Sequence, residues 1–267
     1  MNYPIYLDYN ATTPCLEEVI ETMLPWFGQH FGNASSKSHP YGWVAEEAVE
    51  AAREHIANLI GAKSKELIFT SGATEAINLA IKGIFEYYHP EHQHYITCQT
   101  EHKAVLDTFK SLEKKGTEVT YLPVNQYGEI SVEELEASIK PYTKMIALMW
   151  ANNETGLIHP IDQVKKIAEK HHLILLTDAV QAAGKIPIDV NGVHLMAISA
   201  HKMYGPKGVG VLYIRHNHPL PKPLPLIEGG GHEKGFRSGT LNVAGIVGMG
   251  KAAEIAGRKM MSESLLT

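Results

Sequence analysis

Apolar residues along the chain follow two patterns, one spaced for helices and one grouped in short runs. Between residues 41 and 60 the apolar positions recur every three or four residues, and charged side chains separate them; these positions are Val44, Ala48, Ala52, Ile56 and Leu59. This spacing is typical of an amphipathic helix, and Gly61 can end it as a C-cap. Further helical stretches are predicted at 74–85, 103–114, 132–139, 161–171 and 243–256.

The short apolar runs are predicted to be seven strands. They are bounded by turn residues and cover 66–70, 94–98, 118–124, 145–150, 173–177, 196–200 and 209–214. Most of them alternate with the helical stretches, which is the order of a parallel sheet with crossover helices. Runs such as 173–176 are apolar on both faces, as expected for strands covered by helices on both sides. The sequence therefore predicts an α/β fold with a mainly parallel seven-stranded sheet. Four prolines within 219–225 predict an extended connector after the last strand.

Composition narrows the class of protein. The 24 Lys and Arg against 29 Asp and Glu give a net charge of −5, which gives no reason to expect nucleic acid as a partner. Hydrophobic residues make up 44% of the chain and charged residues only 20%, so a folded core is expected. No run approaches the roughly 20 apolar residues of a membrane span, and the first residues do not have the pattern of a signal peptide.

The two cysteines, Cys15 and Cys98, are too few for a disulfide framework and match no zinc spacing. A reducing compartment, the cytoplasm, is therefore expected. His89, His92 and His94 are close in sequence, but they span a loop and a strand start without a nearby thiolate, and solvated histidines are the commoner case. No metal site is predicted.

Three clusters at predicted strand ends could carry chemistry. In 69–75 a strand runs through small residues into a helix, which is suited to binding a phosphate but also occurs in ordinary turns. Asp178 follows another strand, at the edge of the sheet where α/β proteins bind ligands, although it could equally be a helix N-cap.

The third cluster, 199–208, places Lys202 just past a strand, between hydroxyl, imidazole and glycine residues. A Schiff-base lysine explains this setting better than a solvated surface charge does. Together the clusters offer a phosphate cradle, an acid for a ring nitrogen and an amine for an aldehyde. Pyridoxal 5′-phosphate requires these three groups.

Eight motifs then point to a family. They are YLDYNATTP (6–14), HFGNASS (30–36), TSGATE (70–75), TEHKAV (100–105), NNETG (152–156), DAVQ (178–181), SAHK (199–202) and GGGHEKGFRSGT (229–240). In this order they resemble the cysteine desulfurases of the NifS/IscS type, within the class V, fold-type I enzymes that depend on pyridoxal phosphate. The resemblance covers nearly the whole chain and implies the large domain of that fold.

The resemblance implies a role for each site residue. Lys202 is implied as the lysine of the internal aldimine, and Asp178 as the partner of the pyridine nitrogen, which an opposite charge keeps protonated. His102 is implied to stack on the ring and to help move protons, so that Lys202 and His102 are the expected catalytic residues. Gln181 is implied to bind the phenolic oxygen, and Asn153 to lie near that oxygen or the substrate carboxylate.

The phosphate is implied to be held by Ala73, Thr74, Ser199 and His201, with Thr240 reaching across from a second subunit. The expected assembly is therefore a homodimer, with L-cysteine as substrate and an iron–sulfur scaffold or another sulfur-acceptor protein as a further partner. Residues 1–15 are expected to form an N-terminal segment and residues 16–257 the cofactor-binding domain. Residues 258–267 are expected to begin a small C-terminal domain that is otherwise absent.

The sequence departs from this family in one respect. Family members carry a catalytic cysteine on a mobile loop, and an arginine for the substrate carboxylate, beyond the RSGT motif; neither is found here. Cys15 and Cys98 are poor substitutes, because thiols in such positions are more often buried as small apolar groups. Two alternatives to an active desulfurase stay open: a dimer that binds the cofactor without turnover, and another class V aminotransferase or selenocysteine lyase.

Overall fold

The structure, a computed structural model, describes residues 4–89, 91–216 and 223–264, so the proline-rich stretch lies partly outside the described residues. The sheet within these residues has seven strands, close to the predicted positions. They are β1 (Leu67–Thr70), β2 (His94–Cys98), β3 (Glu118–Leu122), β4 (Thr143–Ala147), β5 (Ile174–Asp178), β6 (Leu195–Ser199) and β7 (Gly210–Ile214). The α-helices are α1 (Glu17–Met23), α2 (Pro40–Ile60), α3 (Ala73–Tyr88), α4 (Lys103–Glu113), α5 (Val132–Ala137), α6 (Ile161–Lys170) and α7 (Val243–Ser264). Short 3-10 turns complete the described elements: η1 (Leu24–Phe27), η2 (Ser64–Glu66), η3 (Ala200–Lys202) and η4 (Glu233–Gly235).

The sheet is mixed but mainly parallel, as predicted. Its strand order is β1-β7-β6-β5-β4-β2-β3, and only β7 pairs antiparallel with its neighbours. Six strands therefore run in one direction, and the carboxyl ends of β1, β2, β5 and β6 meet at one edge of the sheet. This edge collects the residues that follow those strands.

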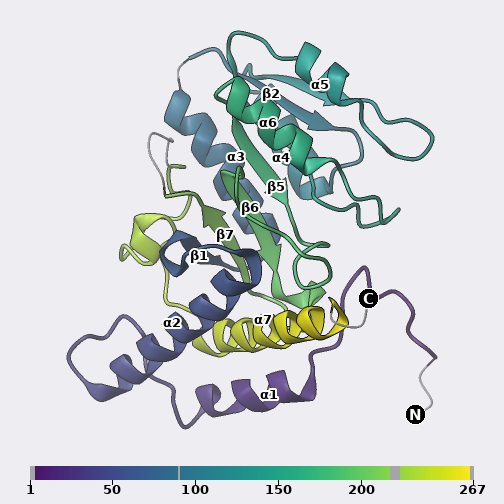
Figure 1. Cartoon of the computed structure of the whole chain (residues 1–267). Coiled ribbons are helices and arrows are strands. Elements are labelled where there is room, and N and C mark those ends of the chain that lie inside the picture. The colour runs from purple at the N-terminus through teal and green to yellow at the C-terminus, as the bar shows by residue number, and fades with distance from the viewer. Residues whose placement is uncertain (1–3, 90, 217–222, 265–267) are drawn as a thin grey trace.

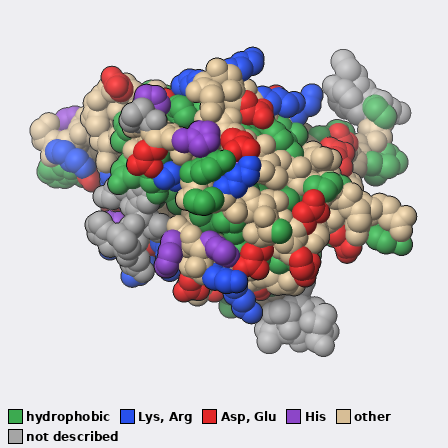
Figure 2. Space-filling model, turned by 90° about the horizontal axis from the view of Figure 1, so that it is seen from above, with side chains coloured by type: hydrophobic (Ala, Val, Ile, Leu, Met, Phe, Trp, Pro, Cys, Tyr) green, Lys and Arg blue, Asp and Glu red, His purple; other side chains and the backbone are tan. Residues whose placement is uncertain are grey.

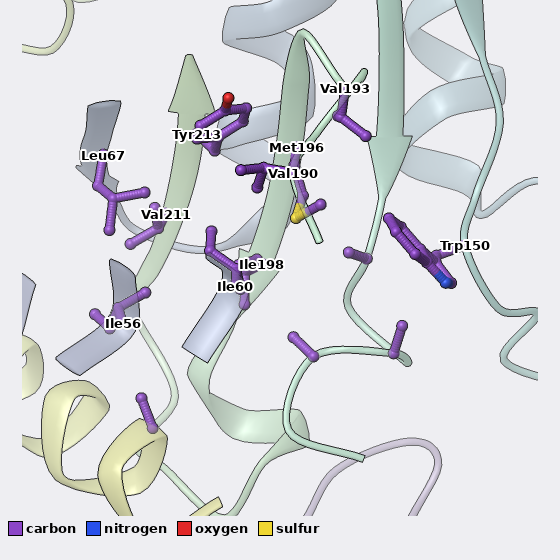
Figure 3. Close-up of a cluster of buried hydrophobic side chains, with 14 of the residues drawn as sticks. Ile56, Ile60, Leu67, Trp150, Val190, Val193, Met196, Ile198, Val211 and Tyr213 are labelled. Carbon is purple, nitrogen blue, oxygen red and sulfur yellow. The ribbon is translucent and has the colours of Figure 1, made fainter. Parts of the chain in front are cut away.

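Helices cover both faces of the sheet because successive strand residues point to opposite sides. On one face the strands pack against α2, α6 and α7, through side chains such as Phe69, Leu175 and Ile198. Figure 3 shows part of this layer, in which Ile56 and Ile60 of α2 lie beside strand residues such as Val211. On the other face α3 and α4 pack against the sheet. Both layers that the apolar runs predicted are present.

The helix α1 was not predicted from the sequence. It is seven residues long, lies directly after the N-terminal segment and packs on α7 beside α2 (Figure 1). Only Val19 of this helix is buried, so its sequence carries almost no apolar periodicity. Helix α7 is longer than predicted and continues through Gly257 to Ser264, across the domain boundary expected at 257/258, which stays a prediction.

Acidic and basic side chains are interspersed over the face of the molecule seen in Figure 2. No helix in the described ranges is long and apolar enough to cross a membrane. The described residues also contain no cluster of three or more His, Cys, Asp or Glu side chains that could hold a metal ion.

Candidate active site

A cavity of about 910 Å³ opens at the carboxyl edge of the sheet. Its lining includes most of the site residues predicted from the sequence: Ala73, Thr74, His102, Asn153, Asp178, Gln181, Ser199, His201 and Lys202. These residues come from five separate segments of the chain, and the shared strand direction brings them together. Thr240 is exposed and is not among the described residues that line the cavity.

Lys202 ends the 3-10 turn η3 directly after β6, and its side chain reaches the N-terminal segment. Its Nζ donates hydrogen bonds to the backbone carbonyls of Asn10, at 2.5 Å, and Ala11, at 2.7 Å. Partial burial lowers the pKa of this amine, and the charge of Asp178 opposes that shift. A lowered pKa increases the fraction of neutral amine, which is the nucleophilic form.

Asp178 is the last residue of β5 and is 7% exposed. Its Oδ1 accepts a hydrogen bond from the backbone N–H of Val180 at 2.9 Å. Burial raises the pKa of this carboxyl, and the positive charges of His102 and Lys202 lower it. Asp178 is therefore a buried carboxyl whose charged form is favoured by His102 and Lys202, and it does not cap a helix.

The N-terminal segment 8–13 forms part of the cavity wall. Asp8, Asn10, Ala11 and Thr12 line it, and Thr13 donates its backbone N–H to the His201 carbonyl at 3.0 Å. Gln181 donates from Nε2 to the Asn10 carbonyl at 3.0 Å, and its Oε1 accepts a hydrogen bond from Lys185 at 2.5 Å. The sequence assigned no roles to residues of this segment, because short segments without periodicity do not show where they pack.

A candidate anion site lies where β1 passes into α3. No side chain caps this helix, whose N-cap is Gly72 at φ 153°, so the first backbone N–H groups of α3 have no partner within the helix. The Thr74 side chain is exposed at the same point. Ser199, which is 4% exposed, and His201 line the cavity with these groups. Uncapped amides at a helix start, together with hydroxyl groups, are suited to a phosphate.

His102 is the N-cap of α4 and lines the cavity. Its Nδ1 accepts a hydrogen bond from the backbone N–H of Ala104 at 3.1 Å, so the neutral ring carries its proton on Nε2. Asn153 donates from Nδ2 to Glu154 at 2.7 Å on the cavity rim. The neighbouring Asn152 is instead a structural residue, because its Oδ1 accepts bonds from Glu154 and Thr155.

The glycine-rich loop that precedes Thr240 is held by two ion pairs. Glu233 makes two 2.8 Å hydrogen bonds with Arg53 of α2, and both side chains are almost fully buried. The same carboxylate accepts the backbone N–H of Phe69 in β1 at 2.6 Å. Arg237 pairs with Glu75 of α3 at 2.8 Å. The loop is therefore attached to the elements that form the anion site.

Neither cysteine is placed for chemistry in the cavity. Cys98 is 0% exposed, and burial raises its pKa to about 12. Burial also raises the pKa of the half-buried Cys15, although the charge of Lys207 opposes it. Both are neutral thiols at neutral pH, and neither belongs to the cavity lining among the described residues.

The sequence also missed Glu101, a fully buried carboxyl beside the predicted His102. Its side chain accepts the backbone N–H of Met149, which lines the cavity. A polar residue between Thr100 and His102 reads as an ordinary turn residue, so no signal in the sequence marks it as buried.

Comparison with known proteins agrees with this arrangement. The class-V aminotransferase family model matches residues 5–265. A protein named cysteine desulfurase IscS from Anaeromyxobacter sp. (strain Fw109-5) is 54% identical over 258 residues, which are 96% of this chain and 64% of that protein. A second IscS, from Neisseria meningitidis serogroup C / serotype 2a, is 52% identical over 95% of this chain and 63% of its own length.

Solved structures show the same likeness. A NifS-like protein superposes with a TM-score of 0.93 at 42% identity, covering 97% of this chain and 71% of that one. A structure titled SspA in complex with cysteine superposes with a TM-score of 0.91 at 42% identity, covering 94% of this chain and 72% of that one. The chain thus spans slightly less than two thirds of the length of the curated relatives described above.

Proposed function

The chain belongs to the class-V aminotransferase family, and from this premise we propose that its cavity is the cofactor site of a cysteine desulfurase. Such an enzyme takes the sulfur of L-cysteine and leaves L-alanine. The cofactor of this class of enzyme is pyridoxal 5′-phosphate. The observation that carries the proposal is the placement of Lys202 and the buried Asp178 at the ends of two adjacent strands, in one cavity.

The residues present fit each polar group of this cofactor. The uncapped start of α3, with the hydroxyl of Thr74, suits its phosphate. The Asp178 carboxylate suits the ring nitrogen, and the Lys202 amine suits the aldehyde. Gln181, whose amide lies in the same cavity, suits the phenolic oxygen. When bound, the cofactor supplies an electron-withdrawing ring to the substrate amino acid.

The chain's own residues prepare this chemistry. The Asn10 and Ala11 carbonyls accept hydrogen bonds from the Lys202 amine and hold it in the cavity, where it would supply the amine for the cofactor's aldehyde. Asp178 lies in a buried site, where its charge, when present, would act more strongly than in water. His102 offers Nε2 as the atom that can donate a proton into the cavity, because its Nδ1 is occupied by the Ala104 N–H.

The proposal is tested by labelling the lysine. The chain is loaded with pyridoxal phosphate, reduced with borohydride, digested and mapped by mass spectrometry. The pyridoxyl label is expected on Lys202, because its amine lies in the cavity, and it should be lost in Lys202→Ala. Lys185 and Lys207 are the internal controls, since Lys207 also lines the cavity and Lys185 contacts Gln181. A label on either of these would refute the assignment.

A second candidate function, a dimer that binds the cofactor without turnover, is favoured by the state of the two cysteines. The sulfur-transfer step requires a thiolate, and Cys98 is a buried thiol with a pKa of about 12. We therefore expect the 267-residue chain to bind the cofactor but to release negligible sulfide from L-cysteine. Sulfide release that is abolished by Cys98→Ala would contradict this and would identify Cys98 as the nucleophile.

Other parts of the proposed activity rest on the family resemblance. They are the homodimer, Thr240 as a phosphate ligand of the partner's site, and a sulfur-acceptor or iron–sulfur scaffold protein as the recipient. A cytoplasmic location is proposed as well, because two cysteines are too few for a disulfide framework.

A further inference from the structure

Glu101 is a buried carboxyl beside the cavity to which the proposed function gives no role. It lies in the turn between β2 and α4, directly before His102, and is only 5% exposed. It is not one of the cavity-lining residues, so it acts on the site through its neighbours.

Glu101 is a buried carboxyl that no cation among the described residues neutralises. Its Oε1 accepts hydrogen bonds from the backbone N–H of Met149 at 2.5 Å and from the Cys98 thiol at 3.6 Å. Its Oε2 is buried and has no hydrogen-bond partner among the described residues. No Lys or Arg pairs with it in the described part of the chain. A buried carboxylate without a cation is costly, and such a group normally takes up a proton.

The charge of Asp178 adds to this effect. Burial raises the pKa of Glu101 to about 8; the hydrogen bond from Met149 opposes this shift, the Asp178 charge adds to it, and the hydrogen bond from Cys98 opposes it. The other titratable group that faces Glu101 is Cys98, which stays a neutral thiol. Burial raises the pKa of Asp178 as well, but the Val180 hydrogen bond and then the charges of His102 and Lys202 favour its charged form, and no cation in the described ranges does so for Glu101. Two carboxyls that share a buried region divide into one neutral and one charged group.

Hydrogen bonds link Glu101 to the cavity wall. In the segment after β4, the Met149 N–H donates to Glu101 and the Trp150 N–H donates to the Asp178 carbonyl at 2.8 Å. The Asn152 side chain of the same segment donates to the Thr100 carbonyl at 3.0 Å. This segment therefore connects the turn that carries His102 with the end of β5 that carries Asp178. Glu101 supplies the only side-chain acceptor among these three bonds.

We propose that Glu101 is a positioning residue: as a neutral carboxylic acid it ties the His102 turn to Met149 and leaves Asp178 as the one negative charge at the cofactor's ring nitrogen. This inference rests on the proposed function for the role of Asp178. An ionised Glu101 would instead disfavour the charge of Asp178, because like charges repel in a region of low dielectric.

Two variants test whether Glu101 acts as an uncharged hydrogen-bond acceptor. Glu101→Gln keeps the volume, the lack of charge and an oxygen for the Met149 N–H, whereas Glu101→Leu removes the acceptor. With the cofactor-loaded chain at pH 6.5, we expect Glu101→Gln to keep the affinity for pyridoxal phosphate within about threefold. Glu101→Leu should weaken it about tenfold or more, which is about 1.4 kcal/mol, because the His102 turn is released.

Infrared difference spectra report the protonation of Glu101 directly and without cofactor. At pH 6.5 the carboxylic-acid carbonyl band is expected in the original chain and should be missing in Glu101→Gln. The control Glu129→Gln, on an exposed turn, should leave the band unchanged. A missing band in the original chain, or an equal loss of affinity in Glu101→Gln and Glu101→Leu, would overturn the proposal.

The proposed function and the proposed role of Glu101 can be refuted independently of each other. If Lys202 is not labelled, the proposed function fails while the infrared band still decides the state of Glu101. If Glu101→Leu does not fold, as judged by circular dichroism, the band and the Glu101→Gln affinity decide the question.

Discussion

His94 at the start of β2 couples the stability of the sheet to pH. It is 0% exposed, and its ring nitrogens bond to Thr143 at 2.7 Å and Thr120 at 2.8 Å. Burial, and after it the charge of Lys140, lower the pKa of His94 to about 4, while Glu118 opposes the shift and His92 adds to it. The unfolded chain has a His pKa of about 6.5.

Between these two pKa values the unfolded state binds more protons than the native state. The stability that the neutral His94 contributes is therefore fully present above about pH 6.5 and is lost as the pH falls toward 4. We expect the free energy of unfolding to fall in this window, by up to about 1.4 kcal/mol per pH unit from this residue. Denaturant titrations of His94→Gln should show a flatter pH dependence than the original chain.

The matched control for this prediction is His55→Gln, which changes an exposed histidine on α2. It should leave the pH dependence of unfolding as it is in the original chain. An equally steep pH dependence in His94→Gln would show that His94 is already protonated in the folded protein or does not titrate on unfolding.

Site residues differ in how far the sequence could predict them. Lys202, Asp178 and Thr74 lie at or within four residues of a strand end, and the common direction of those strands brings them into one cavity. Their meeting could therefore be predicted from the strand pattern. Glu101 could not be predicted to be buried, because its burial depends on Met149, which is 48 positions away in the chain. Asn10 and Ala11 line the cavity, but their place there could not be predicted either, because the packing of this segment leaves no periodic pattern in the sequence.

Gly210, the first residue of β7, determines how closely that strand approaches the anion site. A Cβ at this position would lie 2.6 Å from the Ile198 carbonyl oxygen and 2.7 Å from the Gly72 Cα. Both are backbone atoms and cannot turn away as a side chain can. β7 pairs with β1 and β6 at this point, so the change would press on the turn that starts α3.

We expect Gly210→Ala to lower the free energy of unfolding by about 1–3 kcal/mol, as overpacked substitutions do. The affinity for pyridoxal phosphate should fall as well, because the amides at the start of α3 move. Denaturant unfolding and a fluorescence titration with the cofactor measure the two effects. Gly28→Ala is the control, since a Cβ there meets nothing within 4 Å. Unchanged cofactor affinity in Gly210→Ala would show that the anion site does not depend on this contact.

The elements differ in their predictability for a physical reason. Six of the seven strands are buried along almost their whole length and therefore appear as continuous apolar runs. The seventh, the edge strand β3, is mostly half-buried and was still predicted from its short apolar run. Even so, the run 145–150 was predicted to begin two residues and to end three residues later than β4. Its end was misplaced because Leu148 and Trp150 are buried and bond to β5 beyond the last residue of β4. Helix α1 was missed because only one of its residues is buried, so its sequence shows no apolar periodicity.

The whole molecule exposes apolar side chains near the start of α2. Phe27, Phe31, Tyr41 and Trp43 are each more than half exposed, and the rings of Phe31 and Tyr41 lie 5.5 Å apart. Exposed apolar groups of this size commonly mark an interaction surface. Thr240 is exposed as well and lies outside the cavity lining of its own chain. Both observations support the proposed homodimer, in which each chain completes the site of the other.

A mixed dimer tests this shared site. Lys202→Ala and Thr240→Ala chains, each with its own affinity tag, are co-expressed, and the dimers that carry both tags are purified. If Thr240 serves the partner's cavity, one site combines both substitutions and the other combines an intact Lys202 with an intact Thr240. Because the two sites of a two-fold dimer are otherwise equivalent, about half of the sites should then bind pyridoxal phosphate as tightly as the original chain does. If Thr240 instead served its own cavity, each site would carry one substitution and none would bind tightly. Absorbance of the bound cofactor per dimer distinguishes the two outcomes, and a monomer that retains tight binding would exclude a shared site.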